Sequence, residues 1–279
     1  MRWIGSLRHL KLSATLIIKC FVWPRMAHMP RLIAVVLTYN EEKHIQGCLQ
    51  TLQFADDRLV FDSYSSDNTV ALARVVGAKV LQRKFDDYAS QRNAALDAVS
   101  DQCDWVLFID ADERVTPALA EEIRYTIDHP EIVAWGIPRH NYLFRKLTLG
   151  AGWYPDYQMR LLRIGRVHYD ASRKVHELVV CDGPSGNLTN HLIHYNYRTV
   201  AQFIQKQRQY SSYDAQILAE QGIRPKPQNY LLQPLRQFRW RFIELEGYKE
   251  GWHGFRLSLL MAYYELVKYL KLRQFSRSS

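Results

Sequence analysis

The chain has 279 residues, of which 47% are hydrophobic and 23% charged, and its 37 basic and 28 acidic side chains give a formal net charge of +9. This composition is typical of a globular protein and excludes a largely disordered or collagen-like chain. Residues 1–29 carry five basic and no acidic side chains, residues 30–194 carry 18 and 22, and residues 195–279 carry 14 and 6. A slightly acidic body between two basic ends argues against a uniform nucleic-acid-binding surface and against a nucleic-acid partner.

The basic N-terminal extension, residues 1–29, contains a short apolar run that Lys19 interrupts. This run is too short to span a bilayer, which takes about 20 apolar residues. Met26 and Met29 stand directly before the first predicted strand. Residues 1–25 are therefore either an extension upstream of the true start or a basic amphipathic anchor.

From residue 31 onward, strand and helix patterns alternate. Continuous apolar runs predict buried strands at 31–37, 58–61, 78–81 and 104–109. Helical spacing predicts helices at 45–52, 69–76 and 88–99, with another beginning after Thr116. This order predicts an α/β fold in which a mostly parallel sheet is flanked by helices, within a domain of residues 30–194. Residues 195–279 form a helical extension, with amphipathic helices predicted at 200–221 and 230–274.

Polar segments follow three of the predicted strands, where ligands of parallel sheets bind. Asp110 and Asp112 come directly after the fourth strand, with one residue between them. Two carboxylates in one loop suit a divalent cation, Mg²⁺ or Mn²⁺, that also holds phosphate oxygens. Asp62 and Asp67 follow the second strand, where carboxylates can accept hydrogen bonds from a base or a ribose, or serve ordinary turn chemistry. No GxGxxG or GxxxxGK[ST] motif is present, which argues against dinucleotide oxidoreductases and P-loop NTPases.

Four motifs within residues 31–115 carry a resemblance to a known family: Leu37-Thr38-Tyr39-Asn40-Glu41-Glu42, Asp62-Ser63-Tyr64-Ser65-Ser66-Asp67-Asn68-Thr69, Gln91-Arg92-Asn93 and Asp110-Ala111-Asp112-Glu113. In their order and spacing they resemble the inverting family 2 glycosyltransferases, which have the GT-A fold. Later segments resemble a narrower group, the WaaE-like bacterial lipopolysaccharide core β-1,4-glucosyltransferases: 153–156, 158–163, 175–177, 194–197 and 246–254.

The resemblance implies a site for the nucleotide of the donor, made of Thr38, Asn40, Glu41, Asp62, Asp67, Arg92, Asn93 and Asp110. Within it, Asp62 would contact the uracil and Asp110 the ribose or the sugar. Asp112 would hold the metal ion, with Asp110 as a second metal ligand. His194 is either a further metal ligand or a hydrogen-bonded structural histidine.

An inverting sugar transfer also needs a carboxylate that deprotonates the acceptor hydroxyl. Glu177 falls where the acceptor motif of the resembled family would lie, and Asp156 is the second candidate. Arg160 and Arg163 either bind anionic groups of the acceptor or are simply solvated.

The C-terminal region, residues 195–279, combines its basic excess with 16 aromatic residues. Basic and aromatic residues interleaved in this way predict helices at an anionic membrane surface, or a helical subdomain packed on the catalytic body. The four cysteines lie far apart without a metal-binding spacing, which favours reduced thiols in the cytoplasm.

These observations predict an enzyme, a metal-dependent inverting glycosyltransferase that moves a hexose, with glucose expected, from a UDP-sugar to the lipopolysaccharide inner core. It would lie peripherally at the cytoplasmic face of the inner membrane. The alternatives are a glycosyltransferase for another cell-surface glycan or lipid-linked acceptor, a nucleotidyltransferase, and a non-catalytic sugar-nucleotide-binding protein.

Overall fold

The computed structural model describes residues 29–129, 131–170 and 178–278. Residues 1–25, with the choice between an upstream extension and an anchor, lie outside this range, and so does Glu177. The first part of the described chain alternates strands and helices: β1 (Leu32–Thr38), α1 (Ile45–Gln50), β2 (Asp57–Asp62), α2 (Thr69–Val75), β3 (Lys79–Gln82), α3 (Tyr88–Val99) and β4 (Trp105–Asp110). Each of these elements was predicted from the sequence within a few residues.

The second part of the chain extends the same sheet with strands in both parallel and antiparallel pairing. Its elements are β5 (Glu113–Val115), α4 (Pro117–Thr126), β6 (Ala134–Leu143), β7 (Lys146–Thr148), β8 (Tyr157–Arg163), β9 (Val167–Tyr169), β10 (Val179–Cys181), β11 (Ser185–Asn187) and β12 (Leu192–His194). The main path of the sheet runs β3-β2-β1-β4-β8-β6-β12-β5, while β9 and β10 form a separate pair. The strands β3, β2, β1 and β4 are parallel, and β8 runs antiparallel to both β4 and β6. The predicted α/β fold, a sheet flanked by helices with a C-terminal helical extension, is therefore confirmed, and the sheet that was expected to be mostly parallel is mixed.

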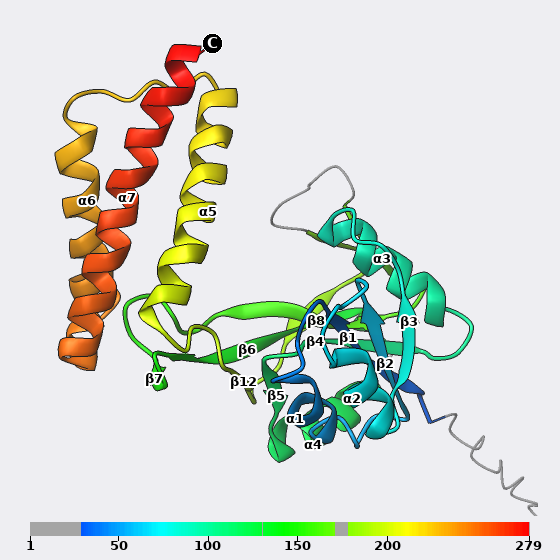
Figure 1. Cartoon of the computed structure of the whole chain (residues 1–279). Helices are drawn as coiled ribbons and strands as arrows, with labels where there is room; N and C mark the ends of the chain where they lie inside the picture. Colours follow the sequence, from blue (N-terminus) through cyan, green and yellow to red (C-terminus); the bar gives the residue numbers. More distant parts are fainter. Residues whose placement is uncertain (1–28, 130, 171–177, 279) are drawn as a thin grey trace, which may run out of the picture.

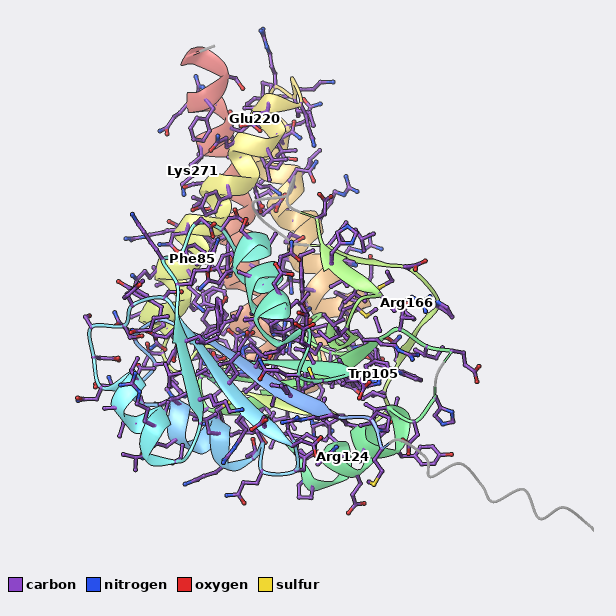
Figure 2. All side chains as sticks on the ribbon, turned by 90° about the vertical axis from the view of Figure 1, so that its right-hand side faces the viewer. Phe85, Trp105, Arg124, Arg166, Glu220 and Lys271 are labelled. Carbon is purple, nitrogen blue, oxygen red and sulfur yellow. The ribbon has the colours of Figure 1, made fainter. Side chains whose placement is uncertain are left out.

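The hydrophobic core lies on both faces of this sheet, because successive residues of a strand point to opposite sides. In β1, Leu32 and Val36 pack into one cluster with residues of α1, α2 and α4, and Ile33 and Val35 pack into the other with residues of α3. Figure 1 shows α1, α2 and α4 on one side of the sheet and α3 on the other. Side chains fill both layers around the buried Trp105 (Figure 2). Two covered faces explain why the strands read as continuous apolar runs.

The C-terminal region forms a bundle of long helices that extends away from the sheet (Figure 1). Its elements are α5 (Val200–Glu220), α6 (Asn229–Arg239), a π-helical turn η1 (Trp240–Glu244), a 3₁₀ turn η2 (Gly247–Glu250) and α7 (Trp252–Ser278). The side chain of Thr199 and that of Gln202 form a reciprocal capping box that starts α5. Leu143, Tyr197 and Phe203 share a buried cluster with residues of α7, which joins the bundle to the end of β6.

The single helix expected over 230–274 is wrong, because the chain reverses direction between α6 and α7. Glu246 and Gly251 have positive φ angles of 55° and 62°, which no continuous helix allows. The turn η2 and the start of α7 also approach closely, since a Cβ atom on Gly254 would lie 1.9 Å from the carbonyl oxygen of Gly247. The reversal could not be recognised from the sequence, because the helical spacing of apolar residues continues on both sides of the turn.

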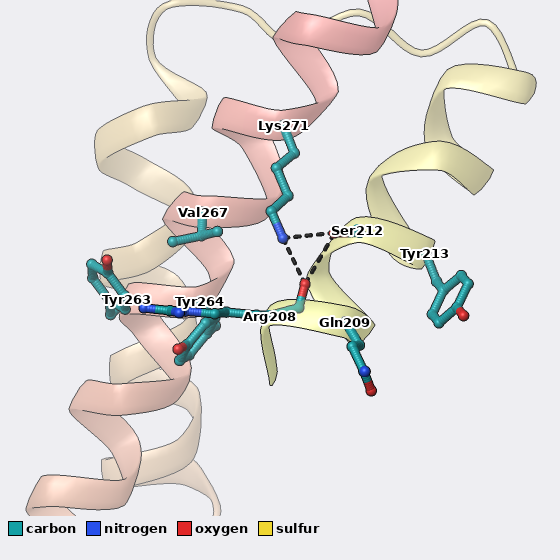
Figure 3. Close-up of a pocket in the computed structure, with 8 residues that line it drawn as sticks. All are labelled: Arg208, Gln209, Ser212, Tyr213, Tyr263, Tyr264, Val267 and Lys271. Carbon is teal, nitrogen blue, oxygen red and sulfur yellow. Dashed lines mark hydrogen bonds between the residues drawn. The ribbon is translucent and has the colours of Figure 1, made fainter. Parts of the chain in front are cut away.

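A cavity of about 580 Å³ lies between α5 and α7 (Figure 3). The ammonium group of Lys271 donates hydrogen bonds to the carbonyl oxygen of Arg208 at 2.6 Å and to the hydroxyls of Ser211 and Ser212 at 2.9 and 2.7 Å. Lys271 therefore links the two helices. No described helix is long and apolar enough to cross a bilayer.

Candidate active site

The carboxyl ends of the parallel strands meet at one edge of the sheet, as the sequence predicts. Thr38 at the end of β1 stands opposite Asp62 at the end of β2, and Leu37 stands opposite Asp110 at the end of β4. The polar segments that follow these strands therefore lie next to one another. This edge is where an α/β sheet of this topology binds ligands.

Asp62 orders the loop after β2. Its side chain is fully buried, and its two oxygens accept hydrogen bonds from the hydroxyl of Thr38 at 2.9 Å, from the backbone N–H of Ser65 at 2.9 Å and from the amide of Gln82 at 3.0 Å. The hydroxyl of Ser65 donates a further bond. Both oxygens are thus occupied by the protein, so the expected contact between Asp62 and the uracil is not available in this conformation.

Asn40 and Asp67 hold the loops after β1 and β2 together. The side-chain oxygen of Asn40 accepts from the backbone N–H of Ser66 at 2.8 Å. Asp67 accepts from the backbone N–H groups of Glu42 at 3.1 Å and Thr69 at 3.0 Å. The φ angle of Asn40 is 57°, a conformation that asparagine adopts more readily than most residues. Both residues therefore shape the predicted nucleotide site through the backbone of its loops.

Asp110 and Glu113 lie in a cluster of arginine side chains. Arg160 contacts both carboxylates, at 3.2 Å from Asp110 through Nη1 and 3.1 Å from Glu113, and Arg92 lies 3.6 Å from Asp110. Glu113 is fully buried and also accepts from the backbone N–H of Asp110 at 2.9 Å and from Arg139 at 3.3 Å. Burial opposes the ionisation of Asp110, but the charges of Arg160 and Arg92 outweigh it and hold the pKa of this carboxyl well below its usual range.

Acceptor binding was one of two roles expected for Arg160 and Arg163, and the structure places neither side chain where it could fulfil that role. Arg160 is only 4% exposed, and its guanidinium is used by Asp110 and Glu113, so it positions these carboxylates. Arg163 pairs with Trp105 at the beginning of β4, the end of that strand opposite to Asp110. Neither arginine is therefore available to an anionic acceptor at the strand ends.

Asn93 anchors β9 to α3. Its side-chain amide donates to the carbonyl of Tyr169 at 2.9 Å, and its oxygen accepts from the N–H of the same residue at 2.8 Å. Tyr169 in turn lies under the guanidinium of Arg92, 5.6 Å from it, with Phe108 5.1 Å away. Asn93 thus supports Arg92, because both polar atoms of its side chain bond to the backbone of Tyr169.

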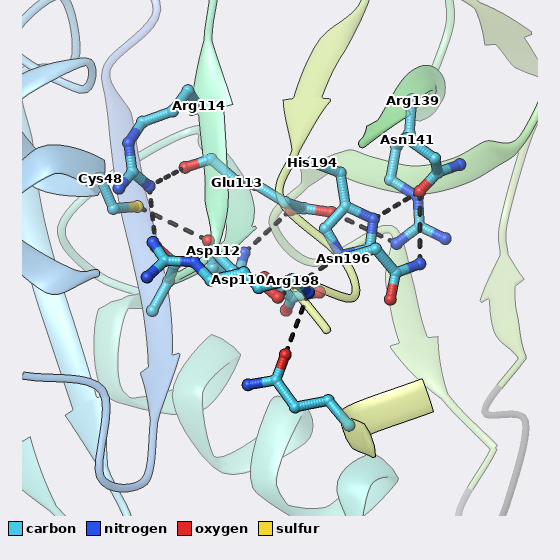
Figure 4. Close-up of polar contacts among 12 residues, drawn as sticks. Cys48, Asp110, Asp112, Glu113, Arg114, Arg139, Asn141, His194, Asn196 and Arg198 are labelled. Atoms are coloured by element: carbon cyan, nitrogen blue, oxygen red, sulfur yellow. Dashed lines mark hydrogen bonds and ion pairs between the residues drawn. The ribbon is translucent and has the colours of Figure 1, made fainter. Parts of the chain in front are cut away.

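Asp112 and His194 face each other at the strand ends (Figure 4), with 3.5 Å between Oδ2 of Asp112 and Nε2 of His194. The other ring nitrogen, Nδ1, lies 2.7 Å from the side-chain oxygen of Asn141. Asn141 uses its NH₂ group to donate to Asp156 and to the carbonyl of Trp153, so its oxygen is the atom left to accept from Nδ1–H. In the neutral imidazole, Nε2 then presents a lone pair towards a carboxylate, an arrangement that a bound cation or a proton would stabilise.

The raised pKa of Glu41 shows that negative charge accumulates at the carboxyl ends of the parallel strands. Burial, followed by the charges of Asp112 and Asp110, raises the pKa of Glu41 from 4.5 to about 7, although Lys206 on α5 acts in the opposite direction. Carboxylates crowded in this way suit a divalent cation. The residues present therefore fit a metal ion bound at Asp112 and His194.

Asp156 lies between Arg139, Asn141 and Gln158. Its Oδ2 accepts hydrogen bonds from Arg139 at 2.6 and 2.9 Å and from Asn141 at 3.0 Å, whereas Oδ1 accepts only from Gln158 at 2.9 Å within the described parts of the chain. Burial opposes its ionisation, but Arg139 and these hydrogen bonds outweigh it and lower the pKa of Asp156. The carboxylate is therefore ionised at neutral pH and keeps one oxygen with spare acceptor capacity.

Three residues of this network were not predicted: Glu113 as a structural carboxylate, and Arg139 and Asn141 on β6. Arg139 and Asn141 are two positions apart on one strand, so they share a face and reach Asp156 together. The polar run Arg139-His140-Asn141 within an otherwise apolar strand was the signal available in the sequence.

Comparison with known proteins gives the context for this geometry. The chain is 31% identical over 257 residues to the lipopolysaccharide core biosynthesis glycosyltransferase LpsC of Rhizobium meliloti, covering 87% of this chain and 92% of LpsC. It is also 26% identical over 279 residues to the uncharacterized glycosyltransferase RT0209 of Rickettsia typhi, covering 90% of this chain and 89% of that protein.

Among solved structures, the chain is similar to TarS residues 1–349 of S. aureus in complex with UDP, with a TM-score of 0.44 and 15% identity over 89% of this chain and 90% of that one. It is similar to glucosyl-3-phosphoglycerate synthase of Mycobacterium tuberculosis in complex with Mn²⁺, UDP and phosphoglyceric acid, with a TM-score of 0.46 and 16% identity over 71% of this chain and 80% of that one. The family model "Glycosyl transferase family 2" matches residues 33–192. The chain therefore belongs to glycosyl transferase family 2 and is a glycosyltransferase.

Proposed function

We propose that the protein transfers a hexose, with glucose expected, from a UDP-sugar to the inner core of lipopolysaccharide, by a metal-dependent direct displacement that inverts the anomeric centre. Family membership and the likeness to LpsC support the reaction class and the acceptor. The observation that carries the mechanism is the pairing of Asp112 with His194 at the strand ends, beside an ionised Asp156.

In this proposal Asp112 and His194 hold Mg²⁺ or Mn²⁺. Asn141 fixes the ring of His194 through Nδ1, an outer contact that orients the ligand. Among the described residues no group of three or more histidine, cysteine or acidic side chains could enclose a metal ion, so diphosphate oxygens and water would complete the coordination. The bound ion would compensate the negative charge of the diphosphate leaving group.

The loops after β1 and β2 bind the nucleotide. Hydrogen bonds from Asn40 and Asp67 preset the shape of these loops, with Asp62 beneath them. Thr38, which is 3% exposed, and Glu41 belong to the first loop. Asp110, held by Arg160 and Arg92, would contact the ribose or the sugar of the donor.

We assign the general base to Asp156. Its Oδ1, which accepts from Gln158 and has spare acceptor capacity, would take the proton of the acceptor hydroxyl as the hydroxyl oxygen attacks the anomeric carbon and the bond to UDP breaks. The bond to Arg139 keeps Asp156 ionised before the reaction and makes it a weaker base than a free carboxylate. Glu177 remains the other candidate, so Asp156→Asn and Glu177→Gln belong in one experiment. The true base variant binds UDP normally and transfers no sugar, whereas the other retains transfer.

We also propose that α6 rests on the anionic surface of the inner membrane, at its cytoplasmic face. Leu231, Leu235 and Ile243 are 66%, 56% and 53% exposed, and Arg236 and Arg239 lie among them on the same side. An apolar face with interleaved arginines is typical of helices that lie at lipid headgroups. The half-buried Phe238 of α6 and Phe242 of η1 are used for packing, because their rings contact Phe255 of α7.

Sedimentation with vesicles tests this contact. The protein is expected to sediment with vesicles containing anionic phosphatidylglycerol and to stay free with purely zwitterionic vesicles. Leu231→Glu together with Leu235→Glu should abolish sedimentation, whereas Val75→Glu, on the exposed side of α2, should not. Equal sedimentation of both variants would rule out α6 as the contact.

The test of the proposed reaction is release of UDP from a panel of UDP-sugars, with core-truncated lipopolysaccharide as the acceptor. UDP-glucose with Mn²⁺ or Mg²⁺ should give acceptor-dependent release, and Asp112→Ala should abolish it. Metal-dependent binding of UDP without release in the presence of acceptor would identify a non-catalytic binding protein instead.

A further inference from the structure

A cavity of about 410 Å³ lies beside the catalytic cluster and is lined by Tyr142, Arg145, Tyr195 and Arg198. Arg145 occupies the turn between β6 and β7, Arg198 lies just before α5, and the two tyrosines belong to β6 and to the residue after β12. The cavity thus forms where the sheet meets the helical bundle. None of these four residues has a role in the reaction proposed above.

The cavity is directly connected to the strand ends. Tyr195 follows His194 in the chain, and its backbone N–H donates to the carbonyl oxygen of Asp112 at 3.0 Å. Tyr142 follows Asn141 on β6 and therefore points to the opposite face of that strand. A ligand in the cavity would lie next to the catalytic cluster and not within it, which is the place for a sugar adjoining the one that reacts.

The turn that carries Arg145 keeps an unfavourable backbone conformation. Phe144 and Arg145 have φ angles of 52° and 66°, values that two-residue hairpin turns usually achieve with asparagine or glycine. Phe144 is held there by the rings of Phe203 and His253, with the guanidinium of Arg256 4.6 Å from its ring. Among the residues that the structure describes, no such packing explains an arginine at the next position. Strain of this kind is retained where the side chain is used.

The charges in the cavity favour an anion. Neither Arg145 nor Arg198 has an ion-pair partner within the part of the chain that the structure describes, and both side chains are exposed. Burial and then the charge of Arg198 lower the pKa of His44, so the positive potential of Arg198 reaches the beginning of α1. Arginine side chains in this state bind carboxylate or phosphate groups through paired hydrogen bonds.

The two tyrosines complete a surface for a sugar. Their ring centroids lie 5.6 Å apart at a tilt of 50°, and the guanidinium of Arg114 lies 5.6 Å from the ring of Tyr195, which fixes it from behind. Tyrosine offers an apolar ring face with a polar hydroxyl, and this combination suits the apolar and polar sides of a sugar.

We propose that this cavity binds an acidic sugar of the acceptor, with Arg145 and Arg198 holding its carboxylate or phosphate group. The identification of that sugar as part of the acceptor rests on the proposed function. In this proposal Arg145 and Arg198 bind the anionic group of the acceptor. Arg160 and Arg163 do not, because the fold places their side chains away from the acceptor.

Isothermal titration calorimetry with the delipidated oligosaccharide of core-truncated lipopolysaccharide tests the proposal on the full chain. Arg145→Asn suits the positive φ angle and removes the charge, and Arg198→Ala removes the second charge. Each variant should bind the oligosaccharide at least about tenfold more weakly than the unmodified protein, as loss of a charged hydrogen-bonding partner requires. Arg74→Ala on the exposed side of α2 is the matched control and should bind normally.

Two further arms identify the anionic group and exclude the donor. The titrations are repeated with oligosaccharide from which the phosphate has been removed and with oligosaccharide whose carboxyl groups have been reduced. The group that the arginines hold is the one whose loss makes the variants and the unmodified protein bind with equal affinity. Affinity for UDP with Mn²⁺ should be unchanged in Arg145→Asn and Arg198→Ala. Oligosaccharide binding within twofold of normal in both variants, or an equal loss of UDP affinity, would overturn the proposal.

The outcome is separable from that of the proposed function. Arginine-dependent oligosaccharide binding without any sugar transfer would refute the transfer reaction and leave the binding site standing. Sugar transfer that is indifferent to both arginine variants would refute the binding site alone.

Discussion

Replacing Arg160 with methionine should strongly destabilise the protein, because Arg160 forms ion pairs with two carboxylates at once. It is 4% exposed, lies 3.1 Å from the fully buried Glu113 and contacts Asp110 through both Nη atoms. Without it, Glu113 keeps Arg139 at 3.3 Å as its remaining cation within the described chain. Removing one partner of a buried ion pair costs about 3–5 kcal/mol, because a charge is left in a poorly solvated place.

The expected loss corresponds to a decrease of roughly 6–20 °C in the thermal unfolding midpoint of a chain of this size. Differential scanning calorimetry measures it. The control is Arg239→Met, whose partner Glu244 lies 3.4 Å away with both side chains more than half exposed, and which should change the free energy of unfolding by less than about 1 kcal/mol.

A second variant tests the physical cause. Arg160→Met combined with Glu113→Gln removes the uncompensated charge and should be more stable than Arg160→Met alone by at least about 1 kcal/mol. If Arg160→Met is as mild as the exposed control, or if the double variant is no more stable than the single one, the electrostatic account of this cluster is wrong.

Three other changes have definite expected outcomes. The folded-state pKa of Glu41 is raised from 4.5 to about 7, so between these pH values the folded state holds a proton that the unfolded state releases, and the free energy of unfolding falls as the pH rises. Glu41→Gln should therefore flatten the pH dependence of the unfolding midpoint, measured in EDTA. An unchanged slope would contradict the raised pKa. Asn141→Ala removes the group that orients His194 and should weaken Mn²⁺ binding, followed by electron paramagnetic resonance, about 10–100-fold, whereas Asn190→Ala should not. Gly254→Ala forces apart η2 and α7 and should lower the unfolding midpoint, while Ala219→Gly near the end of α5 gives the size of a simple helix-propensity change for comparison.

Much of the sheet could be predicted from the sequence, because strands buried on both faces are continuous apolar runs and their helices begin and end at recognisable residues. Thr116, for example, caps α4 through its hydroxyl with Pro117 at the first helical position, as expected. The meeting of Asp62 and Asp110 at one edge followed from parallel pairing alone. The fold back between α6 and α7 was missed because helical periodicity continues on both sides of Glu246.

The partners of each side chain were not predictable in the same way. Arg160 and Arg163 look equivalent in the sequence, yet one is enclosed by two carboxylates and the other lies at the far end of the strand pair. This difference depends on the register between β8 and β4, which no local pattern encodes. Arg139 and Asn141 carry no family signal of their own, and their importance appears only when β6 brings them to Asp156 and His194.

The central claim is metal-dependent transfer of a hexose to lipopolysaccharide. The most direct measurement is mass spectrometry of core-truncated lipopolysaccharide after incubation with the protein, UDP-glucose and Mn²⁺. The account predicts that the acceptor gains one hexose residue, and that EDTA or Asp112→Ala prevents the gain. An acceptor of unchanged mass under conditions where the protein binds UDP, or a gain that persists in EDTA, would contradict it.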